Sequence, residues 1–413
     1  MNGQAAATRY ESLDAIRGVA VMGILAMNIV AFALPFPAYA NPAAGGPPSH
    51  LDLATWFFNF VLIDSKMRGM FSMLFGASTL LVIESAANGG RSAAGAHYSR
   101  MFWLGIFGLI HFYLIWFGDI LFLYAACGLL IFLFRNLSVK ALLIWAGAFF
   151  LIALALPGSL WTMLTMADAG TLPPEAMEGM KQALADMNND MGPGTATYAK
   201  DIAIYLGSYA GIVGHRTGEM GSDPIFFLTM FSWETIGLML IGMALFKSDM
   251  LTGGWEPARY RKWAAACFLI GIPPLVALAF YQINNGFSAI SVFGATIVWS
   301  IPFDTLLTVG WASLIMLLIK TAASADTRAR LAATGRMAFT NYLTTSIVMT
   351  TVFYGYGLGL FGSIARLPLY LFCFGMWAAM LLWSKPWLER FQYGPLEWLW
   401  RSLSRWQLQP MRK

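Results

Sequence analysis

Long apolar runs dominate the chain and leave few structures open to it. The stretch from Ser99 to Tyr124, SRMFWLGIFGLIHFYLIWFGDILFLY, is typical, because one apolar run ends at a Gly-Asp pair and a second follows at once. In a bilayer the backbone polar groups must be satisfied within the protein, which only helices and closed barrels achieve. A membrane helix needs about 20 mostly apolar residues, the length of these runs. They predict an all-α polytopic membrane protein.

The composition excludes a single large soluble domain. Of the 413 residues, 58% are hydrophobic and only 11% are charged, whereas soluble domains carry about 25% charged residues. The net charge of +5 comes from basic residues scattered over short loops, not clustered on one face. Nucleic acid is therefore not an expected partner, and the lipid bilayer is.

Ten membrane spans are predicted within a single domain of residues 1–413. They are 13–34, 55–85, 99–117, 120–135, 139–156, 225–246, 262–282, 294–319, 337–357 and 368–388. The second is too long for one straight crossing, so either Gly69 marks a bend or part of the run lies in the interface. Residues 157–224 form the largest loop, in which PPEAMEGMKQALADM predicts a short amphipathic helix that begins at proline.

The loop charges predict the orientation. When the span ends are assigned alternately to two sides, one side receives most of the arginine and lysine residues. Cytoplasmic loops carry such an excess. The pattern places both termini in the cytoplasm and the 157–224 loop outside.

Two ionisable residues interrupt the stretch from Ser99 to Tyr124. Such residues are costly in a bilayer, so His111 and Asp119 are candidates for a functional site. His111 either donates to a carbonyl of a neighbouring helix or acts as a general base or acyl carrier. Asp119 either caps the following helix or orients His111, and the helix cap is slightly favoured.

Other polar residues in the outer half of the spans predict an outward-open cavity. The second span contains Asp64, Lys66 and Arg68, and the spacing of Asp64 and Arg68 predicts an ion pair within the helix. We expect the set to bind substrate in a polar cavity, although each member could instead satisfy a packing contact between helices. The complete candidate set is Asn28, Asp64, Lys66, Arg68, Glu234 and Asp304.

The predicted cytoplasmic side contains a second candidate site. Arg17, Arg100 and Arg336 could hold a phosphorylated ligand, because arginine recognises phosphate, but these residues are also expected determinants of topology. His97 is predicted to be a solvated loop residue. No ligand spacing indicates a metal site, and no tightly bound cofactor is predicted.

Several stretches together resemble the YeiB-like bacterial inner-membrane proteins, a family with a domain of unknown function. These are SLDAIRGVAVMGILAMNIVAFALP, FSMLFGAS, GLIHFYLIWFGDILFLYAACGLL, GRMAFTNYLTTSIV and YGPLEWLWRSLS, in family order. The resemblance implies a multi-pass protein of the bacterial inner membrane. The family is similar, more distantly, to a clan of membrane acyltransferases that includes the heparan-α-glucosaminide N-acetyltransferases.

The distant resemblance implies transfer of an acyl group from cytoplasmic acyl-CoA to a small-molecule or glycan acceptor across the membrane. His50 lies in the loop comparable to the one that holds the clan's essential histidine, and Asp64 resembles an acidic residue in the following helix. His111 belongs to the YeiB-like HxxxxxxGDIL pattern and ranks first as the catalytic residue. The rival hypothesis is a transporter or exporter of a small polar or anionic metabolite. A homo-oligomer is compatible with either.

Overall fold

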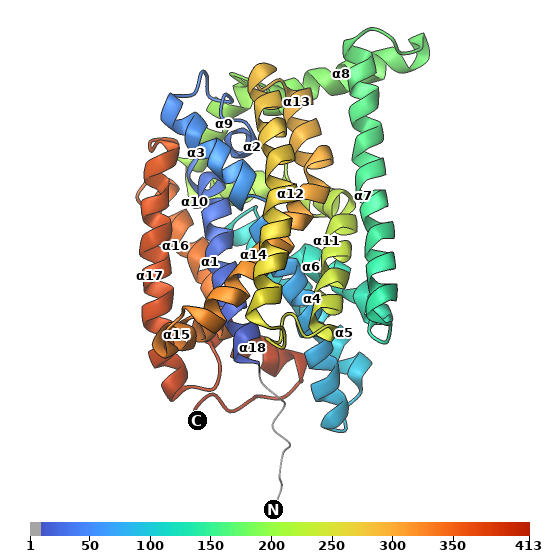
Figure 1. Ribbon diagram of the computed structural model, residues 1–413. Helices are drawn as coiled ribbons and strands as arrows, with labels where there is room; N and C mark the ends of the chain where they lie inside the picture. The colour runs from blue at the N-terminus through green and yellow to red at the C-terminus, as the bar shows by residue number, and fades with distance from the viewer. Residues whose placement is uncertain (1–9) are drawn as a thin grey trace, which may run out of the picture.

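A bundle of upright helices, crossed at both ends by shorter ones, makes up the structure (Figure 1). The computed structural model describes residues 10–413. Within this range the chain forms helices and no strand, apart from an isolated bridge between Phe391 and Arg412. The protein is therefore an all-α polytopic membrane protein, as the apolar runs predict.

The most buried span is the first. Helix α1 (Glu11–Ala33) is 83% buried along its most apolar window, and it packs against α4 (Lys66–Asn88), α15 (Ala325–Arg336), α16 (Ala338–Phe353) and α17 (Arg366–Arg390). Nearly every side of α1 is apolar, as expected for a helix surrounded by others. The rest of the bundle is organised around it.

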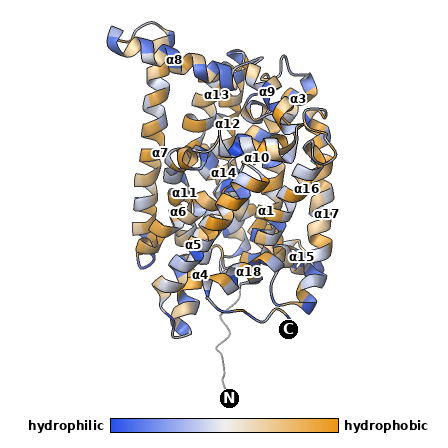
Figure 2. Cartoon of the chain, turned by 180° about the vertical axis from the view of Figure 1, so that it is seen from behind, coloured by the Kyte–Doolittle hydropathy of each residue, from blue (hydrophilic) through white to orange (hydrophobic). Residues whose placement is uncertain are grey.

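The peripheral spans have the opposite character. Helix α7 (Val139–Asp168) is 17% buried and α17 is 22% buried, yet both are strongly apolar. Figure 2 shows hydrophobic residues along most of both helices. Exposed apolar surface of this extent indicates contact with lipid.

Each predicted span overlaps a helix. Eight helical segments within residues 10–413 are long and apolar enough to cross a membrane. The fourth predicted span corresponds to the shorter α6 and η3, Leu121–Phe134, and the ninth to the 16-residue α16. The remaining long segments include α5 (Ala93–Ile110) with η2 (His111–Ile115), α11 (Asp223–Lys247), α12 (Pro257–Asn284) and α14 (Ile301–Thr321).

The second span is broken, but not at Gly69. It consists of α3 (His50–Phe58), the π-helical η1 (Asn59–Ile63) and α4, and the break falls at Ser65, whose φ of 60° lies outside the helical region. The predicted bend at Gly69 is wrong, because Gly69 lies within the continuous α4. A Cβ at Gly69 would lie 2.7 Å from Thr308 Oγ1, so this glycine permits close packing on α14.

Helices α4 and α11 cross with their backbones almost in contact. A Cβ at Gly76 would lie 2.0 Å from the carbonyl oxygen of Met239, and one at Gly242 would lie 1.9 Å from that of Met73. Small residues permit such close approach in membrane helices. The crossing fixes the position of Arg68 on α4 relative to Glu234 on α11, each roughly two helical turns above it.

The upper end of the bundle consists of short helices. Helix α8 (Pro174–Met191) confirms the predicted amphipathic helix, and α7 extends to Asp168, beyond the predicted end at 156. The other short elements there are α2 (Pro37–Ala40), α9 (Ala196–Tyr205), α10 (Tyr209–Thr217), α13 (Ala289–Phe293) and the π-helical η4 (Gly294–Trp299).

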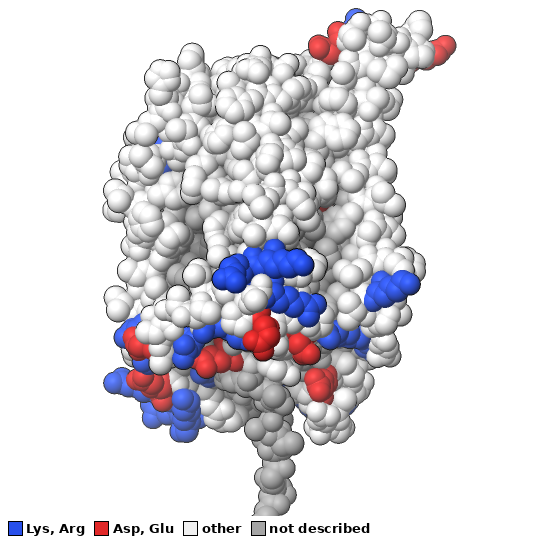
Figure 3. Space-filling model, viewed as in Figure 1, with Lys and Arg blue, Asp and Glu red and all other residues white. Residues whose placement is uncertain are grey.

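Charged side chains on the face shown in Figure 3 gather at the lower end, and apart from the tip around α8 the rest is nearly free of them. The first described turn of α1, the short α18 (Pro395–Ser404) and the C-terminus all lie at this lower end (Figure 1). Such a band is expected of a bilayer-spanning bundle. The predicted position of the N-terminus itself concerns residues 1–9, which lie outside the described range.

Candidate functional site

A cavity of about 200 Å³ lies in the bundle, lined by segments from α1, α2, α4, α6, α7, α11, η4 and α14. The structure brings together five of the six residues predicted to bind substrate, and adds one of the predicted catalytic residues. Those lining the cavity are Asn28, Asp64, Arg68, Glu234, Asp304 and Asp119. Residues from distant parts of the sequence therefore converge on one space, as the polar-cavity hypothesis requires.

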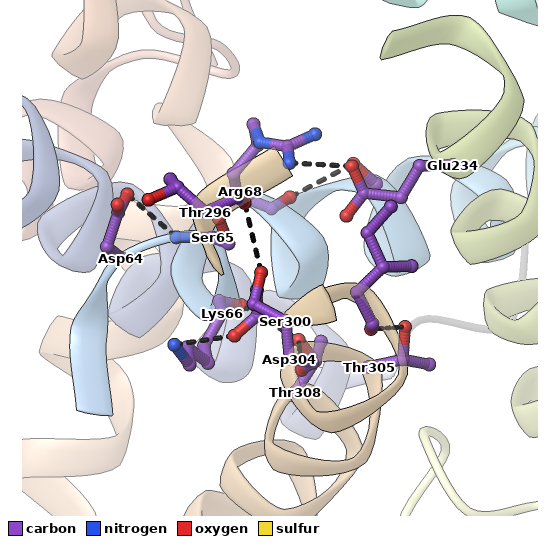
Figure 4. A network of polar contacts seen from close by, with 12 residues as sticks. Asp64, Ser65, Lys66, Arg68, Glu234, Thr296, Ser300, Asp304, Thr305 and Thr308 are labelled. Carbon is purple, nitrogen blue, oxygen red and sulfur yellow. Dashed lines mark hydrogen bonds and ion pairs between the residues drawn. The ribbon is translucent and has the colours of Figure 1, made fainter. Parts of the chain in front are cut away.

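Two ion pairs connect α4 to its neighbours at the cavity (Figure 4). The Nζ of Lys66 lies 2.6 Å from a carboxylate oxygen of Asp304 on α14, and Nη2 of Arg68 lies 2.8 Å from a carboxylate oxygen of Glu234 on α11. Lys66 is only 1% exposed and also donates to the carbonyl of Phe60. A charge buried to this degree requires such partners.

The predicted ion pair between Asp64 and Arg68 is wrong. An i, i+4 pair needs an unbroken helix, and the chain leaves helical geometry at Ser65, between the two residues. Asp64 instead accepts hydrogen bonds from the hydroxyl of Tyr39 and the backbone N–H of Ser65. Burial, followed by the neighbouring Asp64 carboxylate, raises the pKa of Tyr39 well above its usual range, so the hydroxyl remains a donor.

The two roles considered for Asp119 are both present. One carboxylate oxygen lies 2.9 Å from Nδ1 of His111, and the other accepts the backbone N–H of Phe122 at 2.8 Å in the first turn of α6. The short π-helical turn η2 begins at His111 and returns the chain toward α6, which brings these two residues together. The carboxylate of Asp119 thus caps α6 and contacts His111 at the same time.

The second nitrogen of His111 is also engaged. Nε2 lies 2.9 Å from the hydroxyl of Ser346 on α16. His111 is fully buried and does not line the cavity, whereas Asp119 does. The order from the cavity outward is therefore Asp119, His111, Ser346. If the Asp119 carboxylate accepts Nδ1–H, then Nε2 is an acceptor for the Ser346 hydroxyl.

Some polar groups at the cavity have no hydrogen-bond partner among residues 10–413. Nε1 of Trp116 is buried and unpaired, as are Nη1 of Arg68 and the hydroxyl of Thr296. All three residues line the cavity. A buried unpaired donor costs about 1–3 kcal/mol. These groups therefore have hydrogen bonds to offer a ligand.

His50 does not join this site. It is the first residue of α3, where its side chain is exposed, and it does not line the cavity. His97, predicted to be solvated, is instead 1% exposed and its Nε2 bonds to the carbonyl of Gly128 at 2.8 Å, so that prediction is wrong. Of the two candidate catalytic histidines, His50 and His111, only His111 is connected to the cavity, through its contact with Asp119.

The three arginines proposed to bind phosphate lie at the lower end but do not form one site. Arg17 bonds to Asp14 and Ser78, and Arg100 stacks on the ring of Trp400 at 4.0 Å. Arg336 lines a separate hollow of about 390 Å³ with Glu11, Asp14, Lys385 and Glu389 among its residues. Arg100 lies within electrostatic range of Arg17, Arg401 and Arg405, which together form a basic cluster. The hollow that Arg336 lines adjoins this cluster through Asp14, the partner of Arg17.

Sequence reasoning missed three residues of the site. Trp116 is one of many aromatic residues at the ends of the spans, most of which anchor a helix at the interface or pack, and neither Tyr39 nor Ser346 was singled out. The partners of Tyr39 and Ser346 lie 25 and 235 residues away, so no local spacing identifies these two residues. The only available signal for Ser346 was its place in the quoted stretch GRMAFTNYLTTSIV.

Comparison with known proteins gives matches over nearly the whole chain. A family described as "Protein of unknown function (DUF418)" matches residues 245–407. The "Uncharacterized protein YeiB" of Escherichia coli is 33% identical over 402 residues, covering 96% of each chain. The "Uncharacterized protein YxaH" of Bacillus subtilis is 30% identical over 426 residues, covering 98% of this chain and 96% of that protein. No solved structure matches the chain.

Proposed function

Because the chain belongs to the YeiB-like family of multi-pass membrane proteins, and because its cavity adjoins a buried carboxylate–histidine pair, we propose that it is a transmembrane acyltransferase. The acyl group would pass from acyl-CoA on the cytoplasmic side to an acceptor bound in the cavity from the other side. The observation that carries the proposal is the position of Asp119, which lines the cavity and contacts His111 at 2.9 Å.

The pair can accept the proton that acyl transfer releases. An acceptor hydroxyl or amine attacks the thioester carbonyl carbon, the carbon–sulfur bond breaks, and the thiolate of CoA leaves. The acceptor proton moves to the carboxylate of Asp119 and from there to the thiolate, which leaves as the thiol, so Asp119 returns to its ionised form. With its Nδ1–H on the carboxylate, His111 holds Asp119 in position for this transfer.

This role differs from direct catalysis by the imidazole. Both nitrogens of His111 are engaged and the ring has no exposure, so it has no free face for an acyl group or an acceptor. Asp119 is thus the group that would contact the acceptor, and His111 is a positioning residue. Ser346 would fix the orientation of the ring from the far side.

The donor would approach from the lower end. The basic cluster of Arg17, Arg100, Arg401 and Arg405 would bind the phosphates of CoA. Between this cluster and the cavity, the core is rich in buried methionines: Met70, Met73, Met239, Met243 and Met316. Methionine is the most adaptable apolar side chain, so this layer could admit a narrow pantetheine arm.

Incubation of the purified protein in nanodiscs with radiolabelled acetyl-CoA and bacterial membrane extract tests the proposal. We expect label to pass to a component of the extract. His111→Gln and Asp119→Asn should each lower the initial rate at least 100-fold, because general-base catalysis contributes about 10²–10⁴-fold. The matched control is His50→Gln, which alters an exposed histidine and should leave the rate unchanged.

Two results would contradict the proposal. One is the absence of both acetyl-CoA binding and label transfer in the wild-type protein. The other is transfer that is equally fast in wild type and in both His111→Gln and Asp119→Asn, with the fold of each variant checked by thermal unfolding.

A transporter is the second candidate, and a specific observation favours it. The sequence suggested that only the second span is broken, but π-helical turns interrupt two spans that face the cavity, η1 before α4 and η4 before α14. Broken helices that carry polar residues at the midplane are typical of secondary transporters. Uptake of a solute into proteoliposomes, abolished by Asp64→Asn, would support this function, and acyl transfer without uptake would exclude it.

A further inference from the structure

The lining of the cavity divides into a polar and an apolar part. The polar part contains Asp64, Arg68 and Glu234, with Asp119 and Asp304 beside them. The apolar part, on the α7 side, belongs to α7, the upper half of α11, η4 and the first residue of α14, and it comprises Ala153, Pro157, Phe227, Met230, Phe231, Ile297 and Ile301. Further apolar residues line the cavity from α1 and α6, among them Met27 and Leu123. One space therefore offers both hydrogen bonds and hydrocarbon contact.

The apolar part lies at the edge of the bundle. Helix α7 is only 17% buried, and it contacts the bundle mainly through α11 and η4. Aromatic contacts attach it on either side of the cavity, Phe149 with Trp233 at 6.2 Å and Trp161 with Trp299 at 5.4 Å. Figure 1 shows α7 as the outermost helix on this side.

Between these two contacts α7 presents only small side chains to the cavity. Ala153 and Pro157, one helical turn apart, are the only α7 residues that line the cavity among those described. Both are small, and Pro157 has no N–H to donate to the carbonyl of Ala153, which weakens the helix there. The short stretch between the aromatic contacts therefore separates the cavity from the outer face of α7 by one helix, with small side chains on its inner side.

The charge of the polar part limits the head group. Four carboxylates line the cavity (Asp64, Asp119, Glu234 and Asp304), against the single guanidinium of Arg68, with Lys66 paired to Asp304. An anionic head would meet excess negative charge in a low-dielectric site. Hydroxyl or amine groups would instead donate to the carboxylates, and their oxygens could accept from the unpaired Nε1 of Trp116 and Nη1 of Arg68.

We infer that the cavity binds an amphiphile from the bilayer, with an uncharged or cationic head that carries hydroxyl or amine groups and a hydrocarbon chain that lies against α7. The inference rests on the proposed function in one respect: this amphiphile is the acyl acceptor. It enters sideways between α7, α11 and η4, with its head at the carboxylates and its hydroxyl or amine beside Asp119.

A photoreactive probe tests the inference without requiring catalysis. A dodecyl glucosaminide with a diazirine in its chain is added to the wild-type protein in phosphatidylcholine nanodiscs, irradiated, and located by peptide mass spectrometry. We expect labelling of α7 and α11 beside the cavity. Ala153→Trp fills the apolar part and should lower labelling at least tenfold. Leu151→Trp, which adds the same side chain to a 69% exposed position on α7, should not.

The anionic counterpart, dodecyl phosphate with the same diazirine, should label these peptides at least tenfold more weakly. Equal labelling by both probes would overturn the inferred head group, and undiminished labelling of Ala153→Trp would overturn the inferred chain site. Acyl transfer to a water-soluble aminosugar without labelling by the amphiphile would sink this inference and leave the proposed function standing. Specific labelling without acyl transfer to any acceptor would support the inferred site and reject the proposed function.

Discussion

At the scale of single residues, the structure shows how a bundle can hold four carboxylates near the middle of a membrane. Each has a partner from another element or another turn: Lys66 for Asp304, Arg68 for Glu234, Tyr39 for Asp64 and His111 for Asp119. The types of residue were predictable, because charges in membrane spans are rare and functional. The partners were not, because they lie up to 238 positions apart in the sequence.

The pair of Lys66 and Asp304 gives a direct test of this arrangement. Lys66→Met leaves Asp304 buried without its cation and should reduce the free energy of unfolding by about 3–5 kcal/mol. The double variant Lys66→Met with Asp304→Leu removes both charges and should recover most of that loss. Thermal unfolding in detergent measures both effects. If the double variant is as unstable as the sum of the single variants, the two residues are not coupled.

The upper end contains a group whose titration should affect stability. Asp201 on α9 accepts the N–H of Phe36, and burial raises the pKa of its carboxyl to about 6. The folded state therefore holds this proton more tightly than the unfolded state, whose pKa is near 3.8. The stability that Asp201 contributes is fully present below about pH 4 and is lost as the pH rises through about 6.

Asp201→Asn should abolish this dependence. The amide oxygen can still accept from Phe36, and the cost of the ionised carboxylate disappears, which is worth up to about 3 kcal/mol at neutral pH. We expect the melting temperature of the variant to exceed that of the wild type at pH 7.5 and to converge with it below pH 4. A constant difference across this range would show that Asp201 does not titrate in the window.

At the scale of helices, the sequence indicated where apolar runs begin and end, but not how helices are interrupted. The ten predicted spans each overlap a helix, because length and hydropathy determine them. The break at Ser65 was misplaced to Gly69, because glycine signals a bend in sequence whereas the actual break is a serine at positive φ. The turn η4 carried no signal, since π-helical turns have no composition of their own.

The glycines of α4 and α11 give a prediction at this scale. Gly76→Ala and Gly242→Ala would each place a Cβ about 2 Å from a carbonyl oxygen of the other helix, and should destabilise the protein by about 1–3 kcal/mol. Because the crossing positions Arg68 opposite Glu234, catalysis or transport should fall as well. The matched control is Gly375→Ala on α17, where nothing lies within 4 Å of the added atom. If thermal unfolding shows that Gly375→Ala destabilises the protein as much as Gly76→Ala and Gly242→Ala do, the close crossing of α4 and α11 is not what makes these glycines necessary.

At the scale of the whole molecule, the lower end is rich in basic residues, whereas the upper part holds buried carboxylates. The lower end carries the basic cluster and the short α18, and the upper part holds the cavity with its carboxylates. The loop charges predicted this polarity, since the same arginines that set topology gather at one end. What the sequence could not reveal is that the cavity adjoins the lipid-facing α7, because this depends on how α7 stands against α11 and η4.

Sidedness gives the sharpest test of whether an acyl group crosses the membrane through this chain. Protein is reconstituted into vesicles in one orientation, radiolabelled acetyl-CoA is supplied only at the end bearing Arg17 and Arg100, and dodecyl glucosaminide is confined to the other leaflet. We predict labelled amide in the leaflet opposite the donor, and at least 100-fold less with Asp119→Asn. Two results would contradict transfer across the membrane. One is label that stays on the donor side, and the other is a rate of transfer that does not depend on the side to which acetyl-CoA is added.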